Sequence, residues 1–522
     1  MMINSPAKAR SSYSLKRADL LILLGISTSV LLYHILTSAL SGYGYFIDEF
    51  YYIACSKRLA FGYVDHPPLS IVILAFSRWL LGDSIVAVRF FSSLAASATV
   101  FVTGCLARRL GGDRYAIVIA ALAAFVMPVN LLMGSFYSMN AFEPLIWSAI
   151  LYCAIVMVQE ENPRYFLLIG SLMGVGLEMK HTMVLYGIAL VIGMLLTTGR
   201  RFIWNKWFVW GLAACALLVI PNLVWQYQHG FPSLEFYKNA MQNKNIPTGP
   251  LAVVFGQIIF ANPLALPLWL IGLGYCFFMK EGRRYRFLGW AYLFLLAAIV
   301  LTQSSRPDRI AAIYLFLFAA GAVSIGNIQT PAAKRWIQRS VVAMLFLGGI
   351  LAAPIFTPLL PPPILAKYLS TLGISFNLEN GKVDEPVPQW LADRLGWHEL
   401  AMDVSSVYHA LPAEEQKNTV IISTNYGEAG ALELYGPEFD LPPVFATHNS
   451  YHSWGPPPDS VTMFIAVFVE RRDLEKKFSS VAEALVHTCQ DCTRQQRSIP
   501  IYVARDPNFS MSAEWQHFKI FN

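Results

Sequence analysis

The stretch LLILLGISTSVLLYHILTSALSGYGYFIDEFYYIACSKRLAFGYVDHPPL, residues 20–69, joins a long apolar run directly to a loop crowded with acids and aromatic rings. The apolar run is long enough to cross a bilayer as an α-helix, which needs about 20 apolar residues. It is too long for the apolar region of a signal peptide, and no convincing cleavage site follows, so we expect it to remain as the first membrane helix. Asp48 and Glu49 then stand side by side at the mouth of that helix.

The composition of the whole chain also indicates a membrane protein. Of its 522 residues, 55% are hydrophobic and only 14% are charged, whereas about 25% of the residues of a typical soluble protein are charged. The net charge of +6 comes from short, scattered basic clusters, which are typical of a topology signal and do not indicate a nucleic-acid surface. We see no internal repeat, and the sequence predicts a polytopic α-helical protein with the lipid bilayer as its solvent.

Hydropathy predicts about eleven spans, with ends uncertain by a few residues. They lie near residues 19–40, 84–106, 115–133, 141–158, 164–179, 182–198, 207–225, 251–278, 286–303, 309–327 and 340–357. With this count every basic cluster falls on one side, which the positive-inside rule makes the cytoplasm. The N-terminus is then cytoplasmic in a cell (inner or plasma) membrane, and the first loop and everything after Pro358 are extracytoplasmic. The run LSIVILAFSRWLLGD, residues 69–83, is too short for a span and is expected to lie flat on the outer face.

The chain after the last span has a different character. We divide the protein into a transmembrane module, residues 1–358, with its first outer loop at 41–83, and a soluble α/β domain, residues 359–522. Short apolar runs such as TVIIST and VTMFIAVFVE alternate there with charged, helix-like stretches. Cys489 and Cys492 form a CxxC pair, which favours a local disulfide if this domain is exported. A zinc site would need a second pair of ligands at a fitting spacing, and none is present.

Three acids are candidates for catalysis. Asp48 and Glu49 could be ordinary solvated loop acids, but the aromatic residues around them indicate a partly dry setting, where carboxylates can act as bases near neutral pH. Glu143, in SMNAFEPLIW, falls at the outer end of the fourth span, where it could also be a plain helix-capping acid. If acids from separate outer loops face one another, they form an acid/base or metal-binding pair.

Basic side chains gather at the predicted outer ends of spans, against the positive-inside trend. They are Arg89, Lys180, His181, Arg306 and Arg309. Such residues could bind a lipid headgroup or a phosphate leaving group, or they could simply pair with Glu178 and Asp308. No nucleotide-binding loop or hydrolase motif occurs in a usable context, so an activated substrate within the membrane is the simpler source of energy.

Several of these motifs together resemble a known family. YFIDEFYYIAC with LAFGYVDHPPL, GDSIVAVRFFSSLA, SMNAFEPLIW, GLEMKHT, DRIAAIYLFLFAAGAV and the tail pair NYGEAGALELYGP and HNSYHSWGPPP follow in order over most of the chain. They are similar to the dolichyl-phosphate-mannose–protein mannosyltransferase-like enzymes of the GT-C class, and more narrowly to their bacterial and archaeal members related to the lipid A aminoarabinose transferases. The first loop and the tail pair are specific, and the other motifs are weak alone.

The resemblance implies an inverting glycosyltransferase that uses a polyprenyl-phosphate-linked sugar and an extracytoplasmic acceptor, which could be a lipid, a glycan or a protein. Asp48 would be the general base, Glu49 would orient it or bind the acceptor, and Glu143 stands where relatives often have Asp. Lys180 with Arg306 or Arg309 would neutralise the departing phosphate. Asp65, His66, Arg89 and His181 are further candidates for substrate binding.

Three points stay open at this stage. The tail residues His448, Asn449, Tyr451 and Trp454, with Tyr426 and Glu428, could roof an acceptor site or only satisfy buried loop backbone. Two acids could hold Mg²⁺ or Mn²⁺, although the cations already present make an obligatory metal less necessary. A transporter or flippase of lipid-linked substrates is the alternative function, and a membrane scaffold is a further rival. The lack of a repeat and the gathering of polar groups at one face argue against a transporter.

Overall fold

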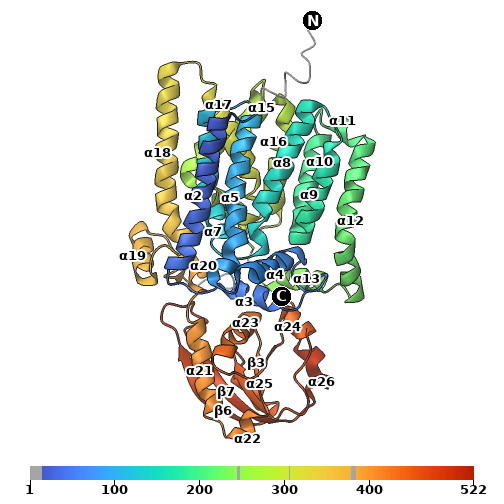
Figure 1. The fold of residues 1–522 in the computed structure, drawn as a ribbon, viewed down its shortest axis with the longest axis vertical. Helices are drawn as coiled ribbons and strands as arrows, with labels where there is room; N and C mark the ends of the chain where they lie inside the picture. Colours follow the sequence, from blue (N-terminus) through green and yellow to red (C-terminus); the bar gives the residue numbers. More distant parts are fainter. Residues whose placement is uncertain (1–13, 244–246, 305, 378–383) are drawn as a thin grey trace. The chain divides into compact units, whose positions relative to one another are not determined.

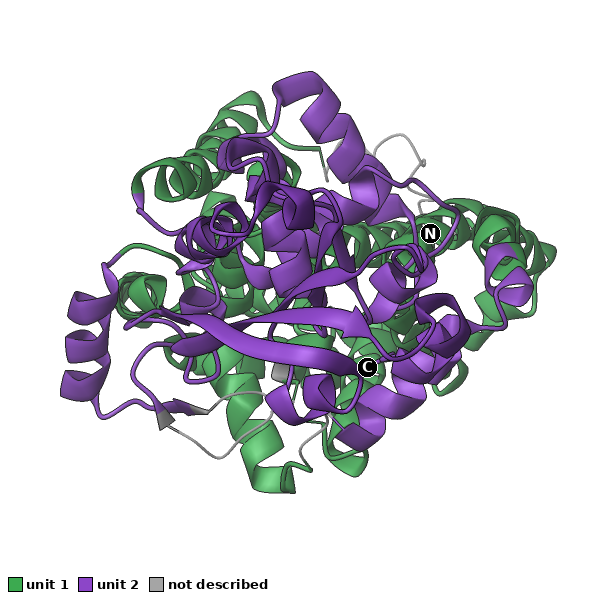
Figure 2. Ribbon diagram, turned by 90° about the horizontal axis from the view of Figure 1, so that it is seen from below, with its two compact units in different colours: residues 1–40, 89–224, 246–359 green, residues 41–88, 225–245, 360–522 purple. Residues whose placement is uncertain are grey.

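The computed structural model describes residues 14–243, 247–304, 306–377 and 384–522, which form two compact units (Figure 2). Unit 1 comprises Met1–Leu40, Arg89–Val224 and Ile246–Leu359, and unit 2 comprises Ser41–Val88, Trp225–Asn245 and Leu360–Asn522. The first loop is therefore grouped with the C-terminal domain in a single unit, although most of the membrane helices lie between the two in the chain.

Unit 1 is helical, and its longer helices run roughly parallel to one another (Figure 1). Its main helices are α2 (Arg17–Leu40), α5 (Ile85–Arg109), α6 (Arg114–Phe125), α7 (Pro128–Gly134), α8 (Glu143–Glu160), α9 (Tyr165–Met179), α10 (Val184–Leu195), α12 (Lys206–Gln228), α14 (Pro250–Phe260), α15 (Leu266–Phe278), α16 (Arg286–Leu301), α17 (Ile313–Gly326) and α18 (Pro331–Phe356). All eleven stretches predicted as spans are helical, which confirms a polytopic α-helical protein.

Fewer helices are long and apolar enough to be complete spans than the eleven that the sequence predicts. Among the described residues, six helices are long and apolar enough to cross a membrane, or up to eight if each of two bent pairs counts as one span. Tyr165–Met179, His181–Leu195 and Ile313–Gly326 are shorter apolar helices, and so is Leu69–Leu81, which agrees with the short helix expected there. A count of eleven spans stays a prediction.

Two stretches expected as single spans are broken helices. Arg114–Phe125 and Pro128–Gly134 meet at a bend of 60°, and Pro250–Phe260 and Pro263–Phe278 meet at a bend of 89°. A proline follows each break, and proline disfavours helical backbone at the residue before it. Asn262, in the second break, donates from Nδ2 to the carbonyl of Val126 in the first at 3.3 Å, so one side chain links both breaks.

Close contact between α15 and α17 depends on two glycines. A Cβ atom added at Gly272 would overlap the backbone of Leu317, and one added at Gly321 would overlap the backbone of Leu268. Small residues let membrane helices approach at backbone distance, where van der Waals packing is the main source of attraction. Each helix therefore supplies one glycine against which the backbone of the other helix packs.

Unit 2 combines short helices with a five-stranded sheet. Its helices include α3 (Ile47–Ser56), α4 (Leu69–Leu81), α13 (Pro232–Asn243), α19 (Pro362–Leu372), α21 (Trp397–His409), α23 (Tyr426–Tyr435) and α24 (Asn449–Ser453). The strands are β3 (Thr419–Ser423), β4 (Val444–Ala446), β5 (Met463–Val467), β6 (Phe478–Thr488) and β7 (Ser498–Pro507), in the order β4-β3-β5-β7-β6. β3 runs parallel to β4 and β5, and β7 runs antiparallel to β5 and β6. The predicted C-terminal α/β domain is therefore confirmed.

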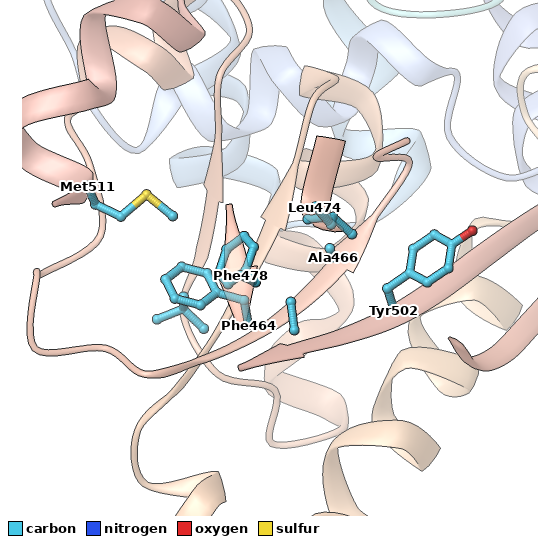
Figure 3. Packing of buried hydrophobic residues seen from close by; sticks show 8 residues of the cluster. Phe464, Ala466, Leu474, Phe478, Tyr502 and Met511 are labelled. Carbon is cyan, nitrogen blue, oxygen red and sulfur yellow. The ribbon is translucent and has the colours of Figure 1, made fainter. Parts of the chain in front are cut away.

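A compact apolar core stabilises one side of this sheet (Figure 3). It contains Val420, Phe464, Ala466, Leu474, Phe478, Tyr502, Ala504 and Met511, each less than a tenth exposed. Six of these residues come from β3, β5, β6 and β7, where alternate residues point to one face, and Leu474 and Met511 come from α25 (Arg471–Glu475) and α26 (Met511–Glu514). Beyond β6, Cys489 and Cys492 form the expected local disulfide.

Candidate active site

The acidic pair of the first loop lies in the first turn of α3, where a helix N-terminus stabilises negative charge. Glu49 is fully buried, and its Oε2 atom accepts a hydrogen bond from the backbone N–H of Phe46 at 2.7 Å. Glu49 therefore holds the start of the helix. Asp48 is half-buried, and its Oδ1 atom accepts a hydrogen bond from the hydroxyl of Tyr426 at 2.8 Å.

Asp65, the acid of the DHPP run, is held in a similar way. The buried hydroxyl of Tyr51 lies 2.7 Å from Asp65 Oδ1 and 2.7 Å from Ser450 Oγ. Burial, and then the charge of Asp65, raise the pKa of Tyr51, so this hydroxyl remains protonated. Two acids of the first loop thus each accept a hydrogen bond from a tyrosine, one on α3 and one on α23.

His66 is part of an aromatic core. It is fully buried, and its ring lies 4.8–5.7 Å from the rings of Tyr51, Tyr52 and Tyr63. Burial lowers the pKa of His66, an effect that the nearby Asp65 opposes. A neutral imidazole in this position stabilises the loop by packing, and a part for His66 in substrate binding stays a prediction.

Three of the tail residues contact α23 or Arg58, which lies just after α3. His448 packs its ring 4.7 Å from that of Tyr426, and Asn449 begins α24 with a left-handed backbone φ of 46°. Tyr451 donates to Glu433 Oε2 at 2.8 Å, and Trp454 packs under the Arg58 guanidinium at 4.3 Å. The two motifs that are most specific in the sequence therefore form one network within unit 2.

Unit 1 brings together a second set of charged residues. Lys180 Nζ lies 2.7 Å from Glu143 Oε2, and both side chains are less than a tenth exposed. Arg306 binds Asp308 through two hydrogen bonds, at 2.9 and 3.1 Å. Burial raises the pKa of Asp308, but Arg306 and then Lys180 more than offset this, so the pKa lies well below its usual range. Lys180 thus pairs with Glu143 instead of Glu178, whereas Arg306 pairs with Asp308 as considered.

The two acids, Glu143 and Asp308, line a pocket within unit 1. Its lining combines α7, α8, α10 and the turns before α8 and α17, and it consists of Val129, Met133, Asn140, Glu143, Pro144, Tyr186, Asp308, Ala311 and Ala312. Glu143 Oε1 is buried and has no hydrogen-bond partner among the described residues. Such an atom is costly to bury unless a donor reaches it, so the pocket suits a ligand that carries hydroxyl groups.

The other predicted residues of unit 1 are not among those that line this pocket. His181 Nε2 lies 3.2 Å from Asn222 Oδ1, and Arg309 accepts at its carbonyl from the hydroxyl of Tyr186 at 2.5 Å. Arg89 is buried near the start of α5. Within the described part of the chain, no group of three or more His, Cys, Asp or Glu side chains is placed to hold a metal ion.

Sequence reasoning left three residues of unit 2 without a role. Tyr51, Glu433 and Ser450 carry its hydrogen-bond network; each lies inside one of the quoted motifs, but the sequence assigned none of them a role. One signal was available: the glycines of YGEAG indicate a helix that another backbone approaches closely. The sequence offers no sign of which backbone that is.

Comparisons with known proteins agree with this architecture. Residues 65–225 match the family described as dolichyl-phosphate-mannose–protein mannosyltransferase. The fold is similar to that of ArnT from Cupriavidus metallidurans bound to undecaprenyl phosphate, with a TM-score of 0.60 and 14% identity over 92% of this chain and 97% of that one. The apo structure of the same protein gives a TM-score of 0.59 and 13% identity over the same shares. No curated protein sequence matches the chain.

The family match over residues 65–225 and the shared fold agree with the resemblance to GT-C class integral-membrane glycosyltransferases seen in the sequence. The fold itself is the one seen in ArnT. The matched segment contains Asp65, Glu143 and Lys180 and begins after Asp48.

Proposed function

We propose that this protein is an inverting glycosyltransferase that moves a sugar from a polyprenyl-phosphate donor to an acceptor hydroxyl at the extracytoplasmic face of the membrane. The observation that carries this proposal is the pocket of unit 1, where Glu143 and Asp308 are each held by a cation. The ArnT structure that shares this fold holds undecaprenyl phosphate, which supports a polyprenyl phosphate as the carrier.

The reaction needs a base and a site for the leaving group. The acceptor oxygen attacks the anomeric carbon, its proton passes to Asp48, and the bond to the phosphate oxygen breaks, which releases the polyprenyl phosphate. Lys180 and Arg306 neutralise the charge that develops on that phosphate. Because Glu143 and Asp308 hold these cations before substrate arrives, little reorganisation is needed, and each such group can supply about 2.7–4 kcal/mol.

Glu143 has a second task in this scheme. One of its oxygens binds Lys180, and the other is buried at the pocket without a partner among the described residues. We assign the second oxygen to a hydroxyl of the sugar, which would restore the missing hydrogen bond. The scheme needs no obligatory metal, and loss of transfer in EDTA would instead indicate a divalent cation such as Mg²⁺ or Mn²⁺.

The orientation belongs to the proposal as well. A cytoplasmic N-terminus and an extracytoplasmic C-terminal domain follow from the basic clusters, and the disulfide between Cys489 and Cys492 supports an oxidising compartment. The acceptor would then be a lipid, a glycan or a protein of the cell envelope.

The test is sugar transfer in proteoliposomes. A panel of radiolabelled polyprenyl-phosphate sugars is supplied with extracts of the host's envelope, and the native protein is compared with Asp48→Asn. Asp473→Asn, a change at an exposed acid of the C-terminal domain, is the matched control. We expect label to move to the acceptor with the native protein and the control, and not with Asp48→Asn. Equal transfer by all three would remove Asp48 from the mechanism.

The alternative, a transporter or flippase of lipid-linked substrates, has one feature in its favour. Broken membrane helices are common around transporter substrate sites, and this chain has two of them. Movement of the intact donor across the bilayer without transfer of its sugar would select that function.

A further inference from the structure

The first tail motif, NYGEAGALELYGP, forms α23, which packs directly against α3, the helix that carries Asp48. A Cβ atom added at Gly430 of α23 would lie 2.8–3.0 Å from Phe50 atoms, including the backbone, and one at Gly427 would overlap the side chain of Ile47. Backbones can approach this closely only where a side chain is missing. The two glycines thus fix the register between α23 and α3, and every other side chain on this face of α23 is placed by that contact.

Tyr426, the first residue of α23, packs against two other rings. Its ring centroid lies 4.7 Å from that of Tyr51, with an angle of 29° between the ring planes, and 4.7 Å from that of His448, with an angle of 31°. Its backbone N–H lies 3.5 Å from Nδ1 of His448. These two ring contacts restrict the rotation of the phenol, and its hydroxyl lies 2.8 Å from Asp48 Oδ1.

We propose that Tyr426 is a positioning residue for Asp48, supplied by the C-terminal domain to the first loop. The inference rests on the proposed function, in which Asp48 takes the proton of the acceptor. A short aspartate in the first turn of a helix can occupy several rotamers, and a hydrogen bond from a fixed phenol selects one of them. A donor to a carboxylate also favours its ionised form, which is the form that a base requires.

The rival explanation is that Tyr426 only fills space between the two helices. Tyr426→Phe distinguishes the two explanations, because it keeps the packed ring and removes only the hydroxyl. Tyr408→Phe is the matched control: the Tyr408 hydroxyl donates to the carbonyl of Gln416 at 3.3 Å, between α21 and α22 (Ala413–Gln416) of the same unit.

The kinetic test is a double-mutant cycle on the proteoliposome transfer assay, with Tyr426→Phe, Asp48→Asn and both changes together. We expect Tyr426→Phe to lower kcat/KM by about 10- to 100-fold, mostly through kcat, as for a lost hydrogen bond to a charged group. The acidic limb of its pH profile should move to higher pH. The residual rate of Asp48→Asn should not fall further in the double variant, because Tyr426 acts through that carboxylate. Equal kcat/KM for Tyr426→Phe, Tyr408→Phe and the native protein would overturn the proposal, and so would additive losses.

A second cycle needs no substrate. Thermal unfolding of the full chain in detergent is measured for the same four proteins, and we expect the two single changes to be non-additive in the melting temperature. Additive shifts would refute the Tyr426–Asp48 contact itself. If no donor supports transfer by the native protein, the proposed function fails and the positioning role with it, whereas non-additive shifts would still establish the contact.

Discussion

Glu428 offers a sharp test of the C-terminal domain, because it is a fully buried acid in the first turn of α23. Neither carboxyl oxygen has a hydrogen-bond partner among other described residues. Burial raises the pKa of Glu428 from its ordinary value of 4.5 to about 7, and only its own backbone N–H opposes this. The folded protein therefore holds Glu428 as a neutral acid under mildly acidic conditions.

The size and sign of the pH effect follow from the two pKa values. Below about pH 4.5 the carboxyl is neutral in both states, and the contribution of Glu428 to the free energy of unfolding is at its highest. Between pH 4.5 and 7 the unfolded chain loses the proton while the folded chain keeps it, so the free energy of unfolding falls with rising pH. At about 1.36 kcal/mol per pKa unit, the loss reaches about 3 kcal/mol above pH 7.

Glu428→Gln should remove this dependence, because an amide does not ionise. Thermal unfolding of the full chain in detergent is measured at pH 5 and pH 8. On going from pH 5 to pH 8, the melting temperature of the variant should rise by several °C relative to that of the native protein, since about 1 kcal/mol corresponds to roughly 2–4 °C. Glu399→Gln, at an exposed acid of α21, serves as the control and should leave the pH dependence unchanged. An infrared band of a protonated buried carboxyl, present at pH 6 in the native protein and absent in Glu428→Gln, gives an independent check.

One result would refute this reasoning. If the native protein and Glu428→Gln lose stability in parallel between pH 5 and pH 8, Glu428 is ionised and solvated in the folded chain. The packing around the start of α23 would then be looser than described, and the register that Gly427 and Gly430 impose would lose its support.

Two further predictions concern stability and packing. Lys180→Met should lower the free energy of unfolding by about 3–5 kcal/mol, because it leaves Glu143 charged and buried. The Lys180→Met/Glu143→Gln double variant should recover most of this loss in thermal unfolding while staying inactive in transfer. Equal melting temperatures for the single and the double variant would contradict the prediction. Gly430→Ala should push α23 away from Phe50, which should lower the free energy of unfolding by about 1–3 kcal/mol and weaken transfer. Gly436→Ala is the control and should be tolerated, because a Cβ there would meet Leu441 at an ordinary 3.4 Å. Similar behaviour of the two variants would show that the contact between α23 and Phe50 is not tight.

Much of this architecture could be predicted from local sequence. The membrane helices follow from hydropathy alone, and the α/β character of the tail follows from short apolar runs between charged stretches. The breaks before Pro128 and Pro263 were missed, because an apolar window averages over a proline and reports only the length of the stretch. Span length and helix continuity are different properties, and only the first is visible in a hydropathy plot.

The site shows a sharper limit. Asp48 and Glu49 stand out in sequence as a pair, yet the structure separates their roles: Glu49 binds the start of its own helix, and Asp48 binds a residue far along the chain. Similarly, Lys180 could be given several acidic partners by sequence, and it pairs with Glu143. Pairings of this kind depend on which elements pack together, and a single sequence holds no direct record of that.

The contact between α3 and α23 has a consequence for how the chain is made. Asp48 and Tyr426 are 378 residues apart, so at about 5–20 residues per second a ribosome needs roughly 20 to 75 s to synthesise the second after the first. Throughout that interval α3 lacks α23, whose Gly427 and Gly430 pack against it. The contact between the two helices forms only when both the first loop and the C-terminal domain are present. Completion of unit 2 is therefore a late event in biogenesis, and a ribosome that stops before residue 426 leaves Asp48 without the partner that fixes it.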